Sequence, residues 1–145
     1  MNRWLGGATA LLLGASLGWG AGQTSEPPRI RYGEEACDRC RMLITEARTA
    51  AALRTAAGDV QRFDDLDCLL RALAAMPGPV TQVWVHAYDT DRWLHADEAW
   101  YVVNPELMTP MGSGVAAFGT QASAEEAVRQ PQGTVLRWAD LEHGG

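Results

Sequence analysis

The sequence contains no lysine, and all 12 of its basic residues are arginine. Eighteen acidic residues outnumber them, which leaves a net charge of −6. Proteins that bind nucleic acid neutralise its phosphates with clustered positive charge, and the sequence has no basic cluster. We therefore expect no nucleic-acid partner.

Long apolar runs are absent from the sequence after its first 22 residues. Arg3 precedes an apolar run over residues 4–19, and the small residues Gly20, Ala21 and Gly22 follow it. The run is short for a membrane span and is interrupted by glycines, a pattern typical of a cleaved export signal. Residues 1–22 are therefore predicted to be a signal peptide that directs the chain to the periplasm. If the signal stays uncleaved, it tethers the chain to the membrane.

Signatures of catalysis are also missing. We find no Ser-His-Asp spacing, no glycine-rich phosphate loop and no pair of carboxylates suited to acid–base chemistry. The sequence indicates a binding protein and not an enzyme.

After a linker at residues 23–36, the chain is predicted to form a first ββαβ unit over residues 37–90. Strands are expected at 48–55, 60–63 and 80–88, because apolar and polar residues alternate there or turn residues flank them. Between the last two strands, Asp64 or Asp65 is suited to cap a helix. The expected apolar face of that helix comprises Leu66, Leu69, Leu70, Leu73 and Met76.

A second ββαβ unit is predicted over residues 91–141, with a tail at 142–145. Its strands are expected at 99–103, 115–118 and 134–138. Its helix is expected to start at a capping box formed by Ser123 and Glu126 and to end at Arg129. The pattern Val-x-x-Phe precedes both helices, at residues 60–63 and 115–118, which favours duplication of one unit over chance similarity. The expected fold class is α+β, with the two units packed together.

The strongest chemical motif is Cys37-x-x-Cys40-x-Met42. Two thiols three positions apart converge in a turn, and the thioether follows closely. Soft sulfur donors select copper(I), whereas zinc normally takes nitrogen or thiolate ligands. The flanking Arg39 and Arg41 are expected to favour the thiolate form.

Other interpretations of this motif stay open. In an exported protein the two thiols are also suited to a structural disulfide, or to the redox pair of a thiol-disulfide oxidoreductase acting on a partner's cysteines. Met42 is equally suited to a hydrophobic core beside Leu43 and Ile44.

Further candidate ligands lie outside the motif. Met111 belongs to a loop with Met108, one proline and two glycines, and this loop is suited to hold its thioether against the cysteines or to fill a gap in the core. His86 lies on a strand facing away from the core and is the weakest candidate. Cys68 is interpreted first as a buried, inert thiol, with a ligand role as the alternative. The acidic residues at 64, 65 and 67 are interpreted first as charges at a helix N-terminus.

Taken together, several motifs resemble the family of the nitrous oxide reductase accessory protein NosL. They cover nearly the whole chain after the signal and comprise Tyr32-Gly33-Glu34-Glu35-Ala36-Cys37-x-x-Cys40-x-Met42-x-Ile44, Phe63-Asp64-Asp65 with Cys68, Trp93 with Ala96 and Ala99, Tyr101-Val102, and Thr109-Pro110-Met111-Gly112-x-Gly114-x-x-Ala117-Phe118.

The resemblance implies a periplasmic copper(I) chaperone that delivers copper for assembly of the nitrous oxide reductase copper centre in denitrification. The implied partner is nitrous oxide reductase or its maturation machinery, in a membrane-associated assembly complex. Many members of the family are lipoproteins with a cysteine at the cleavage point, which this chain lacks. The expected metal ligands are Cys37, Cys40 and Met42, completed by Met111 or His86.

Overall fold

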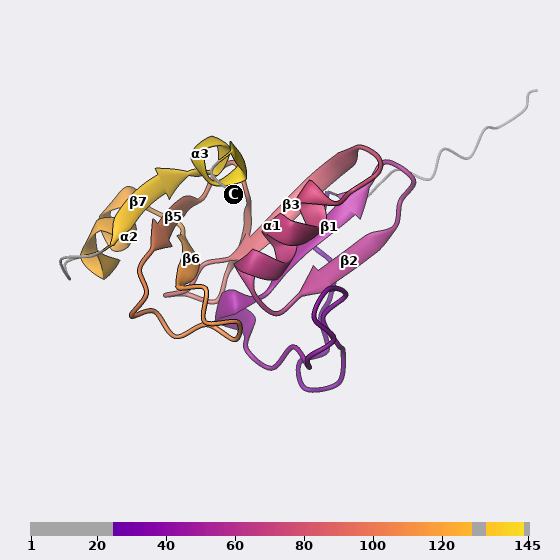
Figure 1. Cartoon of the computed structure of the whole chain (residues 1–145), viewed down its shortest axis with the longest axis horizontal. Helices are drawn as coiled ribbons and strands as arrows, with labels where there is room; N and C mark the ends of the chain where they lie inside the picture. The colour runs from indigo at the N-terminus through magenta and orange to yellow at the C-terminus, as the bar shows by residue number, and fades with distance from the viewer. Residues whose placement is uncertain (1–24, 129–132, 144–145) are drawn as a thin grey trace, which may run out of the picture.

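The computed structural model describes residues 25–128 and 133–143 (Figure 1). The predicted signal segment at residues 1–22 and the predicted end of the second helix at Arg129 lie outside these residues. Among the described helices, none combines the length and the apolar character that crossing a membrane requires.

A four-stranded antiparallel sheet forms the first half of the fold. A short 3-10 helix, η1 (Ala47–Thr49), leads into β1 (Ala51–Thr55) and β2 (Val60–Phe63), and β3 (Val80–His86) and β4 (Trp93–His95) complete the sheet. The strand order is β2-β1-β3-β4. The centre of β1 is fully buried, as expected for a strand paired on both sides and covered by a helix.

Helix α1 (Leu66–Ala74) lies across one face of this sheet (Figure 1). Its N-cap is Asp65, whose carboxylate accepts a hydrogen bond from the Asp67 amide at 2.8 Å. The helix buries Leu66, Cys68, Leu69 and Ala72. The most buried face is therefore rotated slightly from the predicted one, and this rotation turns Cys68 into the protein interior.

The second half repeats the topology of the first. Strands β5 (Trp100–Val103), β6 (Val115–Phe118) and β7 (Thr134–Arg137) form a sheet in the order β6-β5-β7, with α2 (Gln121–Ala127) between β6 and β7 in the chain. The order β2-β1-β3 with α1 is the same arrangement. The predicted α+β fold of two similar ββαβ units is confirmed.

The start of α2 differs from the prediction. The N-cap is Thr120, whose hydroxyl accepts from the Ser123 amide at 3.1 Å. Ser123 therefore lies inside the first turn, and the capping box predicted for Ser123 and Glu126 is wrong. The physical reason is that Thr120, separated from the end of β6 by Gly119 alone, offers its hydroxyl one turn earlier.

Three elements were not predicted, and one of them, η1, occupies the start of the strand expected at residues 48–55. Strand β4 pairs with β3 over only three residues, which is too short to show a clear alternation in the sequence. Helix α3 (Trp138–His143) begins directly where β7 ends, so no turn residue marks the boundary between them.

One hydrophobic core connects the two units. It contains Leu53 and Phe63 from the first sheet, Tyr101 and Ala117 from the second, and Leu141 from α3. A parallel bridge pairs the backbones of Ala87 and Ala117, and the Tyr88 amide donates to the Ala117 carbonyl at 2.8 Å. The N-terminal end of α1 is held beside the second unit by Asp65, which accepts from Met111 and Ser113, and the candidate site forms there.

Candidate metal site

The two cysteines of the Cys-x-x-Cys motif lie in a short hairpin that precedes the first sheet. Ala36 and Leu43 pair as an antiparallel bridge, the Cys37 amide donates to the Met42 carbonyl at 2.8 Å, and the Arg41 amide donates to the Cys37 carbonyl at 3.1 Å. These bonds close the chain over residues 37–42. The turn brings the Cys40 thiol back toward that of Cys37.

Polar contacts with β2 hold this hairpin in place. The Asp38 amide donates to the Arg62 carbonyl at 2.9 Å, and the Arg62 amide donates to the Asp38 carboxylate at 2.7 Å. The Arg62 guanidinium also pairs with Glu35 at 3.6 Å. The end of β2 therefore positions the hairpin, and the next residues in the chain, Asp64 and Asp65, pass directly beneath it.

Four potential ligand atoms converge where the hairpin meets the start of α1. The thiols of Cys37, Cys40 and Cys68 and a carboxylate oxygen of Asp64 all lie within 4.8 Å of one another. The Cys40 thiol donates to the two carboxylate oxygens of Asp64 at 3.3 and 3.5 Å. All three cysteines are free thiols. Two ligands that each lie about 2.3 Å from a metal are at most about 4.6 Å apart, so small movements would allow these atoms to share one ion.

The site is buried except at Cys40. Cys37, Cys68 and Asp64 are 0–1% exposed, whereas Cys40 is partly accessible. Burial raises the pKa of the Cys37 thiol. Burial also raises the pKa of the Cys68 thiol, and the neighbouring Cys37 adds to this rise. Both buried thiols are therefore protonated at neutral pH, and binding of a metal would release their protons.

This result corrects one expectation from the sequence. Arg39 and Arg41 were expected to favour the thiolate form, but both are exposed to solvent, and the removal of water from around Cys37 has the larger effect.

A second loop lies against the same helix terminus. The Met111 amide and the Ser113 hydroxyl both donate to the carboxylate of Asp65 at 2.8 Å. Asp65 is completely buried, and it therefore holds the loop of residues 108–114 against the start of α1. In Figure 1 this loop (orange) and the cysteine hairpin (violet) lie on the same side of the molecule.

The predicted thioether ligands are at the surface. Met42 is 46% exposed, Met111 43% and Met108 76%, so none of them fills a hydrophobic core. Their segments adjoin the thiol cluster, because Met42 follows Cys40 in the hairpin and Met111 bonds to Asp65, the neighbour of Asp64. Their role as ligands stays a prediction.

His86 lies outside the thiol cluster in a separate network. Its Nε2 is 3.0 Å from the Tyr32 hydroxyl, and its Nδ1 is 2.9 Å from the Asp91 carbonyl. Both ring nitrogens are thus engaged. The ring packs against Trp93 at an interplanar angle of 41°, with centroids 3.9 Å apart. The expectation that His86 faces away from the core is wrong, because its side chain is buried against Trp93. Burial lowers the pKa of His86.

Cys68 and Asp64 are the members of the cluster for which the sequence favoured a different primary role. Their spacing of four residues across the N-cap was the available signal, because residues four apart at a helix start lie on the same side. The signal was ambiguous because a carboxylate at that position also favours the helix dipole.

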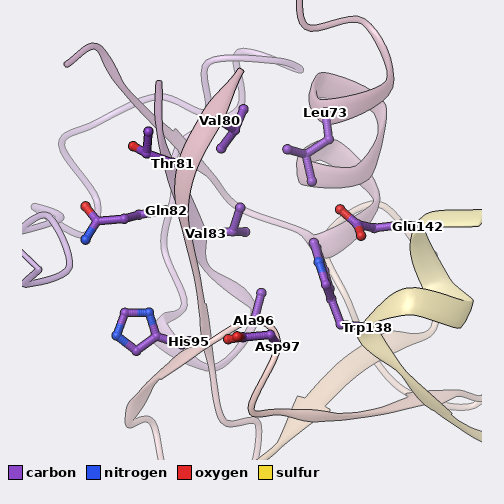
Figure 2. A pocket seen from close by; sticks show the side chains of 10 residues that line it. All are labelled: Leu73, Val80, Thr81, Gln82, Val83, His95, Ala96, Asp97, Trp138 and Glu142. Carbon is purple, nitrogen blue, oxygen red and sulfur yellow. The ribbon is translucent and has the colours of Figure 1, made fainter. Parts of the chain in front are cut away.

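A cavity of about 450 Å³ occupies a different part of the molecule (Figure 2). Leu73, Val80, Val83, Trp138 and Glu142 contribute to its lining. Leu73 is near the C-terminal end of α1 and Val80 begins β3, so the cavity is at the far end of both elements from the thiols. Within the described residues, the only group of three or more potential His, Cys, Asp or Glu ligands is the thiol cluster.

Comparison with known proteins places this arrangement in a family. No curated protein gives a match to the chain. Among solved structures, the chain is similar to the copper chaperone NosL from Shewanella denitrificans, with 25% sequence identity and a TM-score of 0.69 over 82% of this chain and 100% of that chain. The NosL family model matches residues 31–144. The match spans both ββαβ units and the thiol cluster, and the chain therefore belongs to the NosL family.

Proposed function

We propose that this chain is a copper chaperone that binds one copper(I) ion at the thiols of Cys37, Cys40 and Cys68. The observation that carries the proposal is the convergence of three thiols and one carboxylate within 4.8 Å. The similarity to a solved copper chaperone of the same family supports it.

The chemistry of the donors supports copper(I) as the cargo. Thiolates are soft donors, and copper(I) is the first-row ion that accepts thiolate and thioether ligands together. Three cysteines with Asp64 also satisfy the tetrahedral preference of zinc. The exposed thioethers of Met42 and Met111, which are poor zinc ligands, favour copper at the rim of this site. His86 would lose two hydrogen bonds to reach a metal, and we leave it out of the proposed ligand set.

Transfer of the cargo requires a site that accepts an additional ligand. Copper(I) held by two or three sulfurs has room for an incoming donor, which binds before a chaperone ligand leaves. Cys40 is the one partly accessible thiol, so exchange begins there. Met42 and Met111 are suited to hold the ion during its passage, because thioethers bind it without losing a proton and cannot form disulfides.

The family and the sequence together support a location and a recipient. A signal peptide at residues 1–22 would export the chain to the periplasm, and the recipient is nitrous oxide reductase or its maturation machinery. The protein acts by handover, and no catalytic step is required of it.

Anaerobic titration of the reduced protein with copper(I), against a competing chelator, tests the proposal. We expect one tightly bound equivalent in the native chain. Cys37→Ser, Cys40→Ser and Cys68→Ser should each lower the affinity by at least about a hundredfold, since each removes one thiolate from a low-coordinate site. Met42→Leu should lower it by about tenfold or less.

Zinc(II) is titrated in parallel, with Met108→Leu as the matched control because Met108 is the most exposed methionine. This control should leave the copper affinity unchanged. A chain that binds zinc more tightly than copper(I), or that binds copper(I) equally well without Cys68, would contradict the proposed site.

A further inference from the structure

The exposed apolar side chains are concentrated beside the thiol cluster. Among the described residues, the exposed large hydrophobic side chains are those of Tyr32, Met42, Leu43, Met108 and Met111. The first three belong to the cysteine hairpin or adjoin it, and the other two belong to the loop of residues 108–114. Single exposed apolar residues are ordinary, whereas their concentration at one place marks an interaction surface. We call Met42, Leu43, Met108 and Met111 the thioether rim.

The two segments of the thioether rim are neighbours in space. The hairpin contacts Asp64 through Cys40 at 3.3 Å, and the loop contacts Asp65 through the Met111 amide at 2.8 Å. These two aspartates are adjacent in the chain. The hairpin that carries Cys40 and the loop that carries Met111 therefore meet at the start of α1.

Two unpaired positive charges accompany the rim. Arg39 and Arg41 flank Cys40 and are exposed, and within the described part of the chain neither guanidinium forms an ion pair or a side-chain hydrogen bond. By contrast, Arg31, Arg48 and Arg71 pair with acidic side chains. In a chain with a net charge of −6, the turn that carries Cys40 thus presents two exposed guanidinium groups beside a single exposed carboxylate, Asp38, which accepts from the Arg62 amide.

The backbone at Arg41 adds a separate observation. Its φ is +69°, in the left-handed region that glycine and asparagine adopt readily. Another residue type in this region costs about 1 kcal/mol or more. The residue in this strained turn is an arginine whose side chain lies in solvent and forms no ion pair within the described residues.

We infer that the thioether rim with Arg39 and Arg41 is a docking surface for an exported protein whose copper-exchanging face is acidic. The partner would place its own soft donor next to Cys40 while carboxylates around that donor meet the two guanidinium groups. Complementary charge steers association and fixes its orientation. This inference rests on the proposed function, because it names the kind of partner that exchanges copper at the site.

A protein fits this surface better than an anionic membrane does. Stable attraction to anionic lipid takes about four to eight clustered basic residues, whereas this surface offers two on a molecule of net negative charge. The charge pattern also disfavours a second copy of the chain, because each copy would present its two arginines to those of the other.

Binding of two synthetic peptides to the metal-free full chain tests the inference. Both peptides carry two methionines, flanked by four glutamates in one and by four lysines in the other. We expect the glutamate peptide to bind at least about tenfold more tightly at low salt and to shift the methyl NMR signals of Met42 and Met111. Screening should remove the difference at about 0.5 M salt.

The variant Arg39→Gln/Arg41→Asn should abolish the preference for the glutamate peptide. Asparagine suits the positive φ at position 41, so this variant removes the charge without adding strain. The matched control is Arg54→Gln/Arg137→Gln, which also removes two positive charges. Arg54 pairs with Val60 and Arg137 with Trp100, each at the end of its sheet away from the site, and this control should keep the preference.

Equal binding of the two peptides, or a preference that survives in Arg39→Gln/Arg41→Asn, would overturn the inference. The inference would also be overturned if the chain bound vesicles of anionic lipid more tightly than the glutamate peptide. Self-association of the chain that requires Arg39 and Arg41 would overturn it as well. Because the peptides are tested without metal, these results are independent of the copper titration, which tests the proposed function by itself.

Discussion

Asp64 is a buried carboxylate that lies among thiols. Burying a charge is costly unless partners satisfy it, and the thiol of Cys40 donates to both of its oxygens. Its oxygen is the one hard donor in an otherwise soft group. Asp64 therefore bears directly on which metal the cluster prefers.

We expect Asp64→Asn to lower the affinity for zinc(II) much more than the affinity for copper(I). Zinc uses carboxylate oxygen as a ligand, whereas copper(I) is held by sulfur. The expected losses are about a hundredfold for zinc and less than tenfold for copper(I), measured by parallel chelator competition. Equal losses for the two metals would show that the carboxylate acts on the thiols and not as a donor to the ion.

His86 predicts how stability depends on pH. Burial holds its pKa below the ordinary value of about 6.5, so the unfolded chain takes up a proton on this residue at a higher pH than the folded chain does. The free energy of unfolding contributed by neutral His86 is fully present above about pH 6.5 and is lost as the pH falls below it.

We expect His86→Phe to weaken this dependence, because phenylalanine does not titrate and keeps an aromatic ring against Trp93. Urea unfolding at pH 7.5 and 5.5 measures the effect, with His95→Phe as the control that replaces another histidine of the same sheet. If His86→Phe keeps the full pH dependence of the native protein, groups other than His86 cause that dependence.

At the scale of single elements, the N-terminus of α1 both starts the helix and anchors the loop of residues 108–114. The Asp65 carboxylate caps α1 through the Asp67 amide and holds the second loop through Met111 and Ser113. Thr120 caps α2 and bonds only within its own segment. Substitutions at Asp65 and Thr120 can therefore be compared to separate what capping and what anchoring of the loop contribute to the free energy of unfolding.

We expect Asp65→Ala to lower the free energy of unfolding by about 2–4 kcal/mol, since it removes a cap and leaves buried donors unpaired. Thr120→Ala should cost about 1 kcal/mol. Urea unfolding gives both values. Similar costs for the two variants would mean that the contact with the second loop contributes little.

Gly114 predicts a further loss of stability at the base of the same loop. Its φ is +66°, and a Cβ atom there would meet the carbonyl of Asn104. We expect Gly114→Ala to destabilise the protein by more than 1 kcal/mol, with Gly112→Ala, which has the same φ but open space around it, as the milder control. Thermal unfolding of the two variants checks the order.

The sequence predicted the regular elements better than the site. The alternation of apolar and polar residues at 60–63 identified β2, and the spacing of leucines in residues 66–73 identified α1. Both patterns arise because an element that buries one face has apolar residues at regular intervals. The short strand β4 and the helix α3, which starts without a turn, have no such period. Cys37 and Cys40 were recognised by their local spacing. The four-residue spacing of Asp64 and Cys68 suggests only that these two residues share one side of the helix start, and the approach of Cys68 to the cysteine pair depends on how α1 packs.

For the molecule as a whole, the two ββαβ units share a core and also share the site. Tyr101 and Ala117 of the second unit pack in the same cluster as Cys37 and Cys68 of the first. The second unit also has a buried cluster of its own, formed by Val102, Ala116, Phe118 and Ala124, but the larger cluster needs residues of both units. The duplication visible in the topology therefore does not give two independent domains.

We expect the whole chain to unfold in one transition. Tryptophan fluorescence and far-ultraviolet circular dichroism should give the same urea midpoint, because the shared core couples the units. Copper(I) should raise both midpoints together, because at a free concentration one hundred times the dissociation constant it adds about 2.7 kcal/mol to the free energy of unfolding. Two separate transitions would contradict the shared core.

The unequal exposure of the three thiols has a consequence for the chemical vulnerability of the protein. Cys37 and Cys68 are enclosed, and Cys40 is the one that solvent reaches. An alkylating agent or peroxide entering the compartment would therefore modify Cys40 first. Modification of this one sulfur would abolish copper binding and leave the fold intact. A bound copper ion would protect the Cys40 sulfur from such modification.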